Sequence, residues 1–452
     1  MANTSIRRTN SGNGNRKKWT VSWWEKKNKL GAVQRIFSCD EAGNNNHDDF
    51  FQWQTDDKLV IGFYDSGYYL NLTPDRNFRD TNGWYHFVFT WDTAQATASD
   101  RAKFYINGVR ETVFASETYP SQNQDSFINT TEPIEIGKRS DNDTQYLEST
   151  LSHIHFCDGY AYTPSDFGST DSTTGEWKIN TSPSVSYGTN GFFILKDGNS
   201  LTDESPNSNN WSSVSGTLTN TEDCPDNVFC TLNPLDCDLV SGLSNGNNTF
   251  SGFNTGTDYS ATSSTLSASS GKFYWEAKVT DLAEIDQVGV RLQNGVSMSI
   301  QGSNGSAGLQ GTAYGGKSVQ FSNGNKAGDG AQSAYMGGFS ANDIIMVALD
   351  LDNNKITFGR NGQWSDGSGN ANQTYANSTA AFTNLTAGEF YCPAQTSRSY
   401  GSNSGTTQYN FGNGYFGTTA ISSEGTNASN IGKFEYDIPS GFTALSTKGL
   451  NE

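Results

Sequence analysis

The sequence of 452 residues has little of what several large classes of protein need. It holds only six cysteines, four histidines and ten prolines. It has no run of about 18 apolar residues, the length that crosses a membrane as a helix. Residues 1–15 are polar throughout, unlike a secretion signal, in which a charged start precedes an apolar stretch. We therefore expect no membrane insertion, synthesis in a reducing compartment and no framework of disulfides.

Good helix formers are also sparse, whereas glycine and aromatic residues are abundant. The chain contains 48 Gly, 27 Phe, 20 Tyr and 10 Trp, and Asn, Ser and Thr crowd the stretches between apolar residues. This composition is typical of many short strands joined by turns and packed on aromatic cores. The length exceeds what one hydrophobic core organises. The sequence thus predicts an all-β protein with two domains.

A first domain is predicted over residues 16–167. Trp19, Val21 and Trp23 alternate with other residues at a period of two, as in a strand with one buried face. Asn107-Gly108 lies between two such runs and supplies the two residues with positive φ that a tight hairpin turn requires. Further strands are expected at 59–63, 84–91 and 151–156, and a short helical turn at 162–167.

The order of these elements resembles a known family. Trp84-Tyr-His-Phe-Val88, then Phe104-Tyr-Ile-Asn-Gly108, then Ile154-His-Phe156 with a short helix after it are similar to the laminin-G/concanavalin-like sandwich. The resemblance implies no required cofactor, but such modules often hold one calcium ion at a rim, through Asp carboxylates and backbone carbonyls. Asp141 and Asp143 are the candidate ligands here, with Asp65 and Asp92 further away. Solvated loop carboxylates are the alternative.

Residues 168–238 are predicted to be a linker, and residues 1–15 a separate polar segment. The linker is rich in Ser, Thr, Asn and Asp, although apolar islands at 187–195 and 227–235 should pack against a sandwich. The stretches 203–211 and 231–235 resemble connectors in structural proteins of marine bacteriophages, where they join a laminin-G-like module to a second sandwich.

The second domain is predicted over residues 239–452. Residues 271–279, 288–291 and 343–362 resemble successive strands of a SPRY domain, although a Gly-, Ser- and Asn-rich insertion between 296 and 336 departs from that pattern. Together the two halves predict two β-sandwich (jelly-roll-like) domains in series, concanavalin/laminin-G-like and then SPRY-like.

Catalytic and metal-binding patterns are weak. Retaining glycosidases need two carboxyl groups about 5 Å apart, and the nearest pattern, Glu284 and Asp286, lacks a further Glu. His153 and His155 have the spacing of a metal pair on one strand face, but strand histidines without a metal are the preferred reading. The cluster of Cys224, Cys230 and Cys237 lacks the paired spacing of a zinc site. We expect no enzymatic activity.

Charge is distributed unevenly along the chain. The formal net charge is −18, yet residues 1–30 hold eight basic residues and one acidic residue. An acidic body argues against nucleic acid as a partner, because phosphate contacts require a basic surface. The basic start predicts docking on an acidic partner in a virus particle. The residues expected to dock are Arg7, Arg8, Arg16, Lys17 and Lys18. A solvated first strand is the alternative.

The predicted function is that of a virion structural protein on the outer surface of the particle. It would be a head-fibre, decoration or tail-fibre component, made in the host cytoplasm and present as an oligomer or a multi-copy array. Its partners would be host cell-surface glycans or other virion proteins. Aromatic residues near turns could stack on sugars, and they are Tyr64, Tyr68, Tyr69, Tyr119 and Tyr160. A polysaccharide-degrading tail enzyme and a cellular carbohydrate-binding adhesin remain the alternatives.

Overall fold

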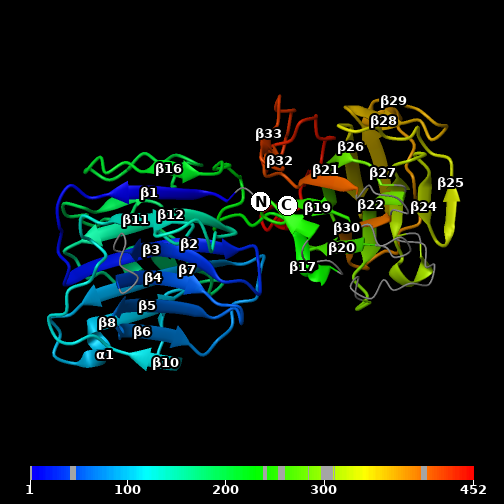
Figure 1. Cartoon of the computed structure of the whole chain (residues 1–452). Coiled ribbons are helices and arrows are strands. Elements are labelled where there is room, and N and C mark those ends of the chain that lie inside the picture. Colours follow the sequence, from blue (N-terminus) through cyan, green and yellow to red (C-terminus); the bar gives the residue numbers. More distant parts are fainter. Residues whose placement is uncertain are drawn as a thin grey trace. The chain divides into compact units, whose positions relative to one another are not determined.

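The computed structural model of the chain divides into two compact units (Figure 1). It describes residues 3–40, 47–237, 242–252, 260–283, 285–296, 309, 311–398 and 405–452. The first unit holds Met1–Asn220 and Cys224–Asp226, and the second holds Thr221–Asp223 and Asn227–Glu452. Each unit is built from two large, almost wholly antiparallel sheets, which confirms the predicted fold class.

The first unit is a sandwich of an eight-stranded and a six-stranded sheet. The larger sheet has the order β10 (Phe114–Thr118), β6 (Tyr68–Pro74), β5 (Leu59–Asp65), β4 (His47–Trp53), β3 (Gln34–Asp40), β11 (Pro133–Ile136), β1 (Ser5–Thr9) and β16 (Ser212–Ser215). The smaller has the order β15 (Phe192–Ile194), β12 (Ser149–Asp158), β2 (Lys18–Lys27), β7 (Trp84–Asp92), β8 (Ala102–Ile106) and β9 (Val109–Arg110).

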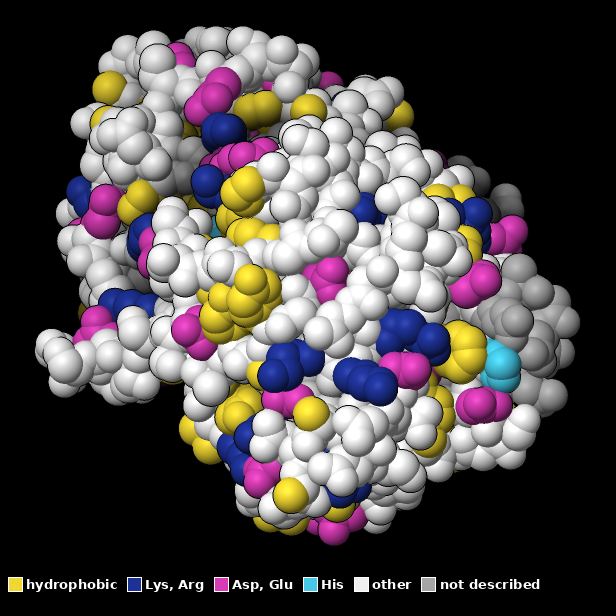
Figure 2. Space-filling view, turned by 90° about the vertical axis from the view of Figure 1, so that its left-hand side faces the viewer, with side chains coloured by type: hydrophobic (Ala, Val, Ile, Leu, Met, Phe, Trp, Pro, Cys, Tyr) yellow, Lys and Arg dark blue, Asp and Glu magenta, His cyan; other side chains and the backbone are white. Residues whose placement is uncertain are grey.

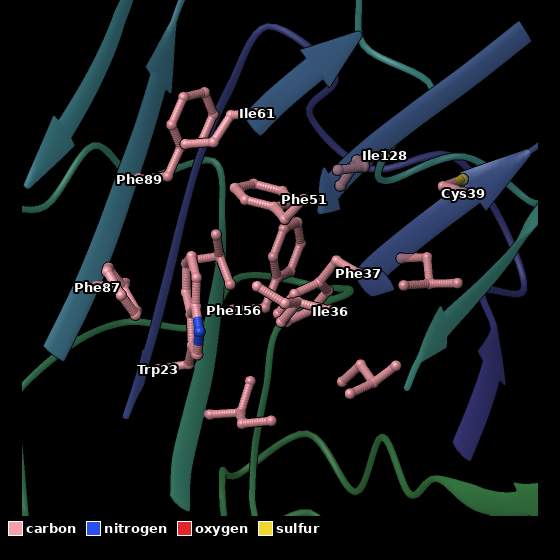
Figure 3. Close-up of a cluster of buried hydrophobic side chains, with 14 of the residues drawn as sticks. Trp23, Ile36, Phe37, Cys39, Phe51, Ile61, Phe87, Phe89, Ile128 and Phe156 are labelled. Atoms are coloured by element: carbon pink, nitrogen blue, oxygen red, sulfur yellow. The ribbon is translucent and has the colours of Figure 1, made fainter. Parts of the chain in front are cut away.

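Aromatic side chains fill the space between these sheets, as Figure 3 shows. The alternation along β2 turns Trp19, Val21 and Trp23 inward, and Trp23 packs on Phe87 with ring centroids 5.1 Å apart. Phe51 of β4 meets Trp23 edge-on at 5.5 Å. Rings in tilted and edge-to-face pairs add about 0.5–1.5 kcal/mol per pair beyond the area they bury. The predicted aromatic core is therefore present.

The hairpin and the helical turn of the first unit form where they were predicted. Asn107 and Gly108 join β8 to β9 with φ angles of 46° and 83°. The turn after β12 is the 3-10 helix η1 (Pro164–Asp166), whose capping box joins Thr163 and Asp166. The other short elements of this unit are α1 (Ala98–Arg101) and the hairpin of β13 (Gly168–Thr170) and β14 (Trp177–Ile179).

The boundaries of the first unit differ from those predicted. β1 lies inside the segment predicted to be separate, and it pairs with β11 on one side and with β16 on the other. β15 and β16, from the predicted linker, complete the two sheets. Asp203 explains how so polar a stretch is ordered, because its carboxylate accepts hydrogen bonds from the backbone N–H groups of Phe193, Ser205 and Asn209 at 2.7–2.9 Å.

The second unit is a sandwich of a seven-stranded and a nine-stranded sheet. The smaller has the order β17 (Leu232–Cys237), β20 (Ser260–Ser264), β30 (Tyr391–Arg398), β22 (Ile285–Leu292), β23 (Lys317–Gln320), β24 (Lys326–Gly328) and β25 (Ala331–Ser333). The larger has the order β18 (Leu243–Ser244), β19 (Thr249–Ser251), β31 (Thr406–Asn410), β21 (Lys272–Asp281), β26 (Ile344–Asp350), β27 (Lys355–Arg360), β28 (Gln363–Ser365) and β29 (Ala371–Gln373), with β34 (Thr443–Ala444) parallel to β21.

The strands predicted in this half are confirmed at β21, β22, β26 and β27. Asn361 and Gly362, with φ angles of 51° and 83°, form the turn between β27 and β28. The remaining short elements of the described residues are β32 (Tyr415–Phe416), β33 (Thr419–Ala420), η5 (Thr312–Tyr314), η6 (Tyr375–Asn377) and η7 (Gly449–Asn451). Among the helices of the described ranges, none has the length and apolar character needed to span a bilayer.

A buried carboxylate fastens the C-terminal segment of the second unit to its larger sheet. Glu276 of β21 accepts hydrogen bonds from the backbone N–H of Glu435 at 2.9 Å and of Tyr436 at 2.8 Å. The Tyr274 hydroxyl and the Asn410 amide donate two more, at 3.0 and 3.2 Å. Burial raises the pKa of Glu276 to about 7. The four donors compensate for the loss of water around this group.

Candidate binding groove

A hollow of about 430 Å³ lies in the first unit, beside the end of β7. Its wall is the loop 159–163, which follows β12, and its other side is formed by residues of β2, β7, α1 and β8. The loop brings a stacked pair of tyrosines to a region that also holds carboxylate, amide and ammonium groups. Such a mixture of aromatic and hydrogen-bonding groups is typical of ligand sites.

Buried strand residues hold the loop in place. The hydroxyl of Thr20 donates to the carbonyl of Tyr160 and accepts from the N–H of Tyr162, both at 2.9 Å. Thr90 donates to the carbonyl of Tyr162 at 2.7 Å. Gly159 turns the chain with φ of 85°, and its N–H donates to the carbonyl of Lys18 at 3.0 Å. Because these bonds fix the backbone, the wall of the groove is formed before any ligand arrives.

The aromatic part of the groove is partly open to solvent. Tyr160 is 42% exposed, and its ring stacks on Tyr162 with centroids 5.8 Å apart and an interplanar angle of 17°. Tyr105 of β8 also lines the groove, and burial raises the pKa of its hydroxyl. Each of the three rings can offer an apolar face or a hydroxyl hydrogen bond to a ligand.

The charged groups of the groove neutralise one another. Lys18 lies 3.3 Å from the Asp92 carboxylate, and Lys103 lies 3.5 Å from Asp100. The Gln95 amide donates to Asp92 at 2.8 Å. Hydrogen-bonding capacity of both kinds is thus present without an excess of either charge, and this arrangement favours a neutral polyhydroxylated ligand over an anion.

The tyrosines predicted to stack on sugars occupy different environments. Tyr160 lines the groove, and Tyr68 is 48% exposed with its ring edge-on to Tyr64 at 5.3 Å. Tyr69 packs against the core, where its hydroxyl donates to the buried Asp49 at 2.5 Å. Tyr119 packs partly buried against the same core. Tyr69 therefore belongs to the interior of the sandwich and is not placed to stack on a sugar.

Sequence reasoning missed Tyr162 and Tyr105. The only available signal was the spacing Tyr160-Ala-Tyr162, in which the two rings are two residues apart in an irregular segment. The outward face of a strand such as β8 cannot be recognised as a groove from the sequence, because the loop that covers it comes from more than fifty residues later.

The basic residues of the N-terminal region do not form one free patch. Arg7 forms an ion pair with the buried Glu135, and Arg16 donates a hydrogen bond to the carbonyl of Ser126 at 2.7 Å. Lys18 lies in the groove, and the remaining two predicted docking residues are Arg8, which is half-buried, and Lys17, which is exposed. Figure 2 shows Lys and Arg lying among Asp and Glu on the face that it displays, without a large area of one sign.

Arg7 and Arg8 line a second hollow, of about 410 Å³, together with Asn209 and Asn210. Arg8 donates to the carbonyl of Asn190 at 3.2 Å, and burial lowers the pKa of its guanidinium. This hollow is more open than the first and has no aromatic side chain among its lining residues. It is therefore the weaker of the two as a binding site.

The predicted calcium ligands pair with basic side chains. Asp143 lies 2.6 Å from Lys138, which holds the pKa of this carboxyl below its usual range. Asp141 lies 2.7 Å from Arg139. Asp65 pairs with His47 at 2.9 Å. Within the described ranges, no group of three or more His, Cys, Asp or Glu residues is arranged to hold a metal ion. These carboxylates do not form a ready set of oxygen ligands, and calcium binding stays a prediction.

The two strand histidines have separate partners. The Nδ1 atom of His153 lies 2.7 Å from the Ser152 hydroxyl, and that of His155 lies 2.9 Å from the Tyr187 hydroxyl. The register of β12 against β2 shifts between Ser152 and His155. Both histidines are buried, and burial lowers the pKa of each, that of His153 to about 4. They are neutral residues of the sandwich.

The carboxylates and cysteines considered from the sequence as catalytic or metal-binding residues do not form a site among the described residues. Glu284 lies outside the described residues. Asp286 is buried, accepts a hydrogen bond from the N–H of Ala283 at 2.7 Å, and has its pKa raised to about 6 by burial. The six cysteines, all within the described ranges, form no disulfide, and Cys230 and Cys237 belong to the core of the second unit.

Comparison with known proteins supports the reading of the first unit. The family model described as the concanavalin A-like lectin/glucanases superfamily matches residues 2–166. This range includes β2, β7, α1, β8 and the loop that form the groove. No curated protein matches the chain.

Several solved structures are similar to parts of the chain at low identity. The SPRY domain of human HERC1 is 17% identical, with 39% of this chain and 96% of that chain covered and a TM-score of 0.29. A heptameric SAP-like pentraxin from Limulus polyphemus is 16% identical, with 48% and 90% covered and a TM-score of 0.29. A human SPRY domain is 15% identical, with 36% and 90% covered and a TM-score of 0.25.

Proposed function

We propose that the first sandwich binds a neutral carbohydrate in the groove beside β7. The observation that carries this proposal is the exposed Tyr160 ring, stacked on Tyr162 above side chains that donate and accept hydrogen bonds. Sugar rings present C–H faces to aromatic rings and hydroxyls to polar groups, so a site for them needs both. The match of residues 2–166 to a lectin and glucanase superfamily supports the same ligand class.

The setting proposed for this activity is the outer surface of a virus particle. The chain would be a head-fibre, decoration or tail-fibre component without enzymatic activity, and its carbohydrate would belong to the host surface. This part of the proposal rests on the resemblance of the segments at 203–211 and 231–235 to connectors of phage structural proteins. Many copies on one particle would strengthen a weak sugar contact through avidity.

The test is a titration of the purified protein with neutral oligosaccharides, in which isothermal titration calorimetry measures the binding. Tyr160→Ala should weaken binding roughly ten-fold, because one aromatic stacking contact contributes about 1–1.5 kcal/mol. Tyr68→Ala is the matched control, since it removes an equally exposed tyrosine from a different part of the first sandwich. Loss of binding in the Tyr68 variant alone would move the site to β6, and unchanged binding in both variants would contradict the proposal.

The two alternative functions predict different results. A polysaccharide-degrading enzyme would release reducing ends, and this release would be lost in Asp286→Asn. A cellular adhesin would be found on the producing cell rather than on particles. Locating the chain by labelled antibodies on purified particles and on cells separates the virion proposal from the adhesin.

A further inference from the structure

A lysine is buried inside the first sandwich. Strand β2 turns Trp19, Val21 and Trp23 toward the core, and the same alternation carries Glu25 and Lys27 to the space between the sheets. The Lys27 side chain is 0% exposed, and its Nζ atom lies 4.6 Å from the centre of the Trp53 ring. A lysine is almost never fully buried unless it is paired, so its partner is informative.

The partner is the side chain of Asp57, in the turn between β4 and β5. Lys27 Nζ lies 2.6 Å from Asp57 Oδ1, and the Asp57 side chain is only 6% exposed. The N–H of Gly31 donates to the same oxygen at 2.8 Å, and Arg79 approaches the other oxygen at 3.3 Å. Asp57 has φ of 65°, so a constrained turn presents its carboxyl to the amine.

A second carboxyl group accompanies this pair. Glu25 is buried, and it accepts hydrogen bonds from Trp23 Nε1 at 3.0 Å, from Trp53 Nε1 at 2.8 Å and from the Ser149 hydroxyl at 2.7 Å. It also interacts electrostatically with Lys27. Burial raises the pKa of Glu25 and lowers that of Lys27, so both groups are pushed toward their neutral forms.

These conditions are those that amide condensation requires. An amine must be unprotonated to attack a carboxyl carbon, the two groups must be held in contact, and a neighbouring group must transfer a proton to the departing oxygen. In water the charged forms prevent this reaction. In a dry aromatic pocket the charged pair is costly to maintain, and condensation removes both charges.

We propose that Lys27 and Asp57 become joined by an intramolecular isopeptide bond, with Glu25 as the proton carrier. One proton passes from Nζ of Lys27 to the Asp57 oxygen 2.6 Å away, the lone pair left on Nζ attacks Cγ of Asp57, and a C–N bond forms. The protonated Glu25 donates its proton to the hydroxyl oxygen on Cγ, the C–O bond breaks, and Glu25 recovers a proton from the nitrogen. One water molecule leaves, and no oxidant, metal or cofactor takes part.

The bond would join the end of β2 in the smaller sheet to the β4–β5 turn of the larger sheet, two positions 30 residues apart in the chain. Such a link would tie the two layers of the sandwich covalently. It would restrict the unfolded chain as a disulfide does, but it would be insensitive to reducing agents. The six cysteines, which lie in the described part of the chain, form no disulfide that would link the layers in the same way.

The test is the intact mass of the full-length protein under denaturing conditions, followed by tandem mass spectrometry of a tryptic digest. We expect the protein to be lighter than its sequence by one water molecule, and a branched peptide to join Lys27 to Asp57. The full sequence mass in a folded sample, with a linear peptide ending at Lys27, would overturn the proposal and leave a plain ion pair.

Variants identify the source of the missing water. Lys27→Met and Glu25→Gln should have their full sequence masses, while Lys29→Gln should still lack one water, because Lys29 is a half-exposed neighbour paired with Glu148. A missing water in Lys27→Met would show that another group had dehydrated, and this too would overturn the proposal. Near-ultraviolet circular dichroism verifies that Glu25→Gln is folded, and a folded Glu25→Gln that still forms the bond would exclude the role of Glu25.

Discussion

Replacement of Glu276 tests whether one carboxylate fastens the C-terminal segment of the second unit. In Glu276→Ala, two backbone N–H groups, a tyrosine hydroxyl and an amide lose their acceptor together. A buried donor left without a partner costs about 1–3 kcal/mol. Entering water and small movements of the side chains will recover part of this loss. We therefore expect the free energy of unfolding of the second unit to fall by about 3–5 kcal/mol, the range for breaking a buried charged network. Glu276→Gln retains one acceptor oxygen, so its free energy of unfolding should fall by about half as much as that of Glu276→Ala.

Hydrogen exchange measured by mass spectrometry in increasing urea at pH 8 resolves this effect. Peptides covering β21 and residues 433–438 report the second unit, and peptides of β2 and β7 are the internal reference. Glu435→Gln is the matched control, because its side chain bonds only the exposed Ser422 in the described structure, and it should cost less than about 0.5 kcal/mol. If Glu276→Ala costs no more than this control, the segment is held by apolar contacts such as that of Tyr274 with Phe434.

Two further predictions concern pH and assembly. In the second unit, which holds no histidine, burial raises the pKa of Glu276 to about 7 and that of Asp286 to about 6, above the value of about 4 in an unfolded chain, so the folded unit binds protons more tightly. The thermal midpoint of the second unit should therefore rise as pH falls from 8 to 5, with a smaller rise in Glu276→Gln, and a midpoint of this unit that stays constant or falls would contradict this reasoning. If the basic N-terminal region docks on an acidic virion partner, the exposed Lys17 is available for this contact. Lys17→Glu should then lower the number of copies of the protein per particle. Unchanged incorporation would exclude a docking role for this residue.

The strands and turns of the core were predictable because their signals are local. The alternation of Trp19, Val21 and Trp23 and the Asn107-Gly108 turn each depend on residues within a few positions of one another. The same local pattern could have shown that Lys27 lies on the inward face of β2. The basic composition of residues 1–30 does not reveal this burial, because composition alone does not distinguish a buried charge from a solvated one.

What could not be predicted depends on contacts between distant residues. The segment around Asp203 has the composition of a linker, yet its polar groups satisfy one another and the backbone of β15. Arg7 could not be recognised as a fixed residue, because its partner Glu135 lies 128 positions later. The groove likewise required the loop after β12 to be placed against β7 and β8, which no local pattern encodes.

The position of β1 between β11 and β16 has a consequence for the order of folding. Its two neighbours, 133–136 and 212–215, are made long after it, so neither edge of β1 can be paired while the first half of the unit is being synthesised. Pairings of such long sequence separation form late, because the loop must close before the contact stabilises it. On a ribosome the first sandwich should thus remain incomplete until Ser215 has emerged, and a nascent chain halted before β16 would expose one edge of β1 to other chains.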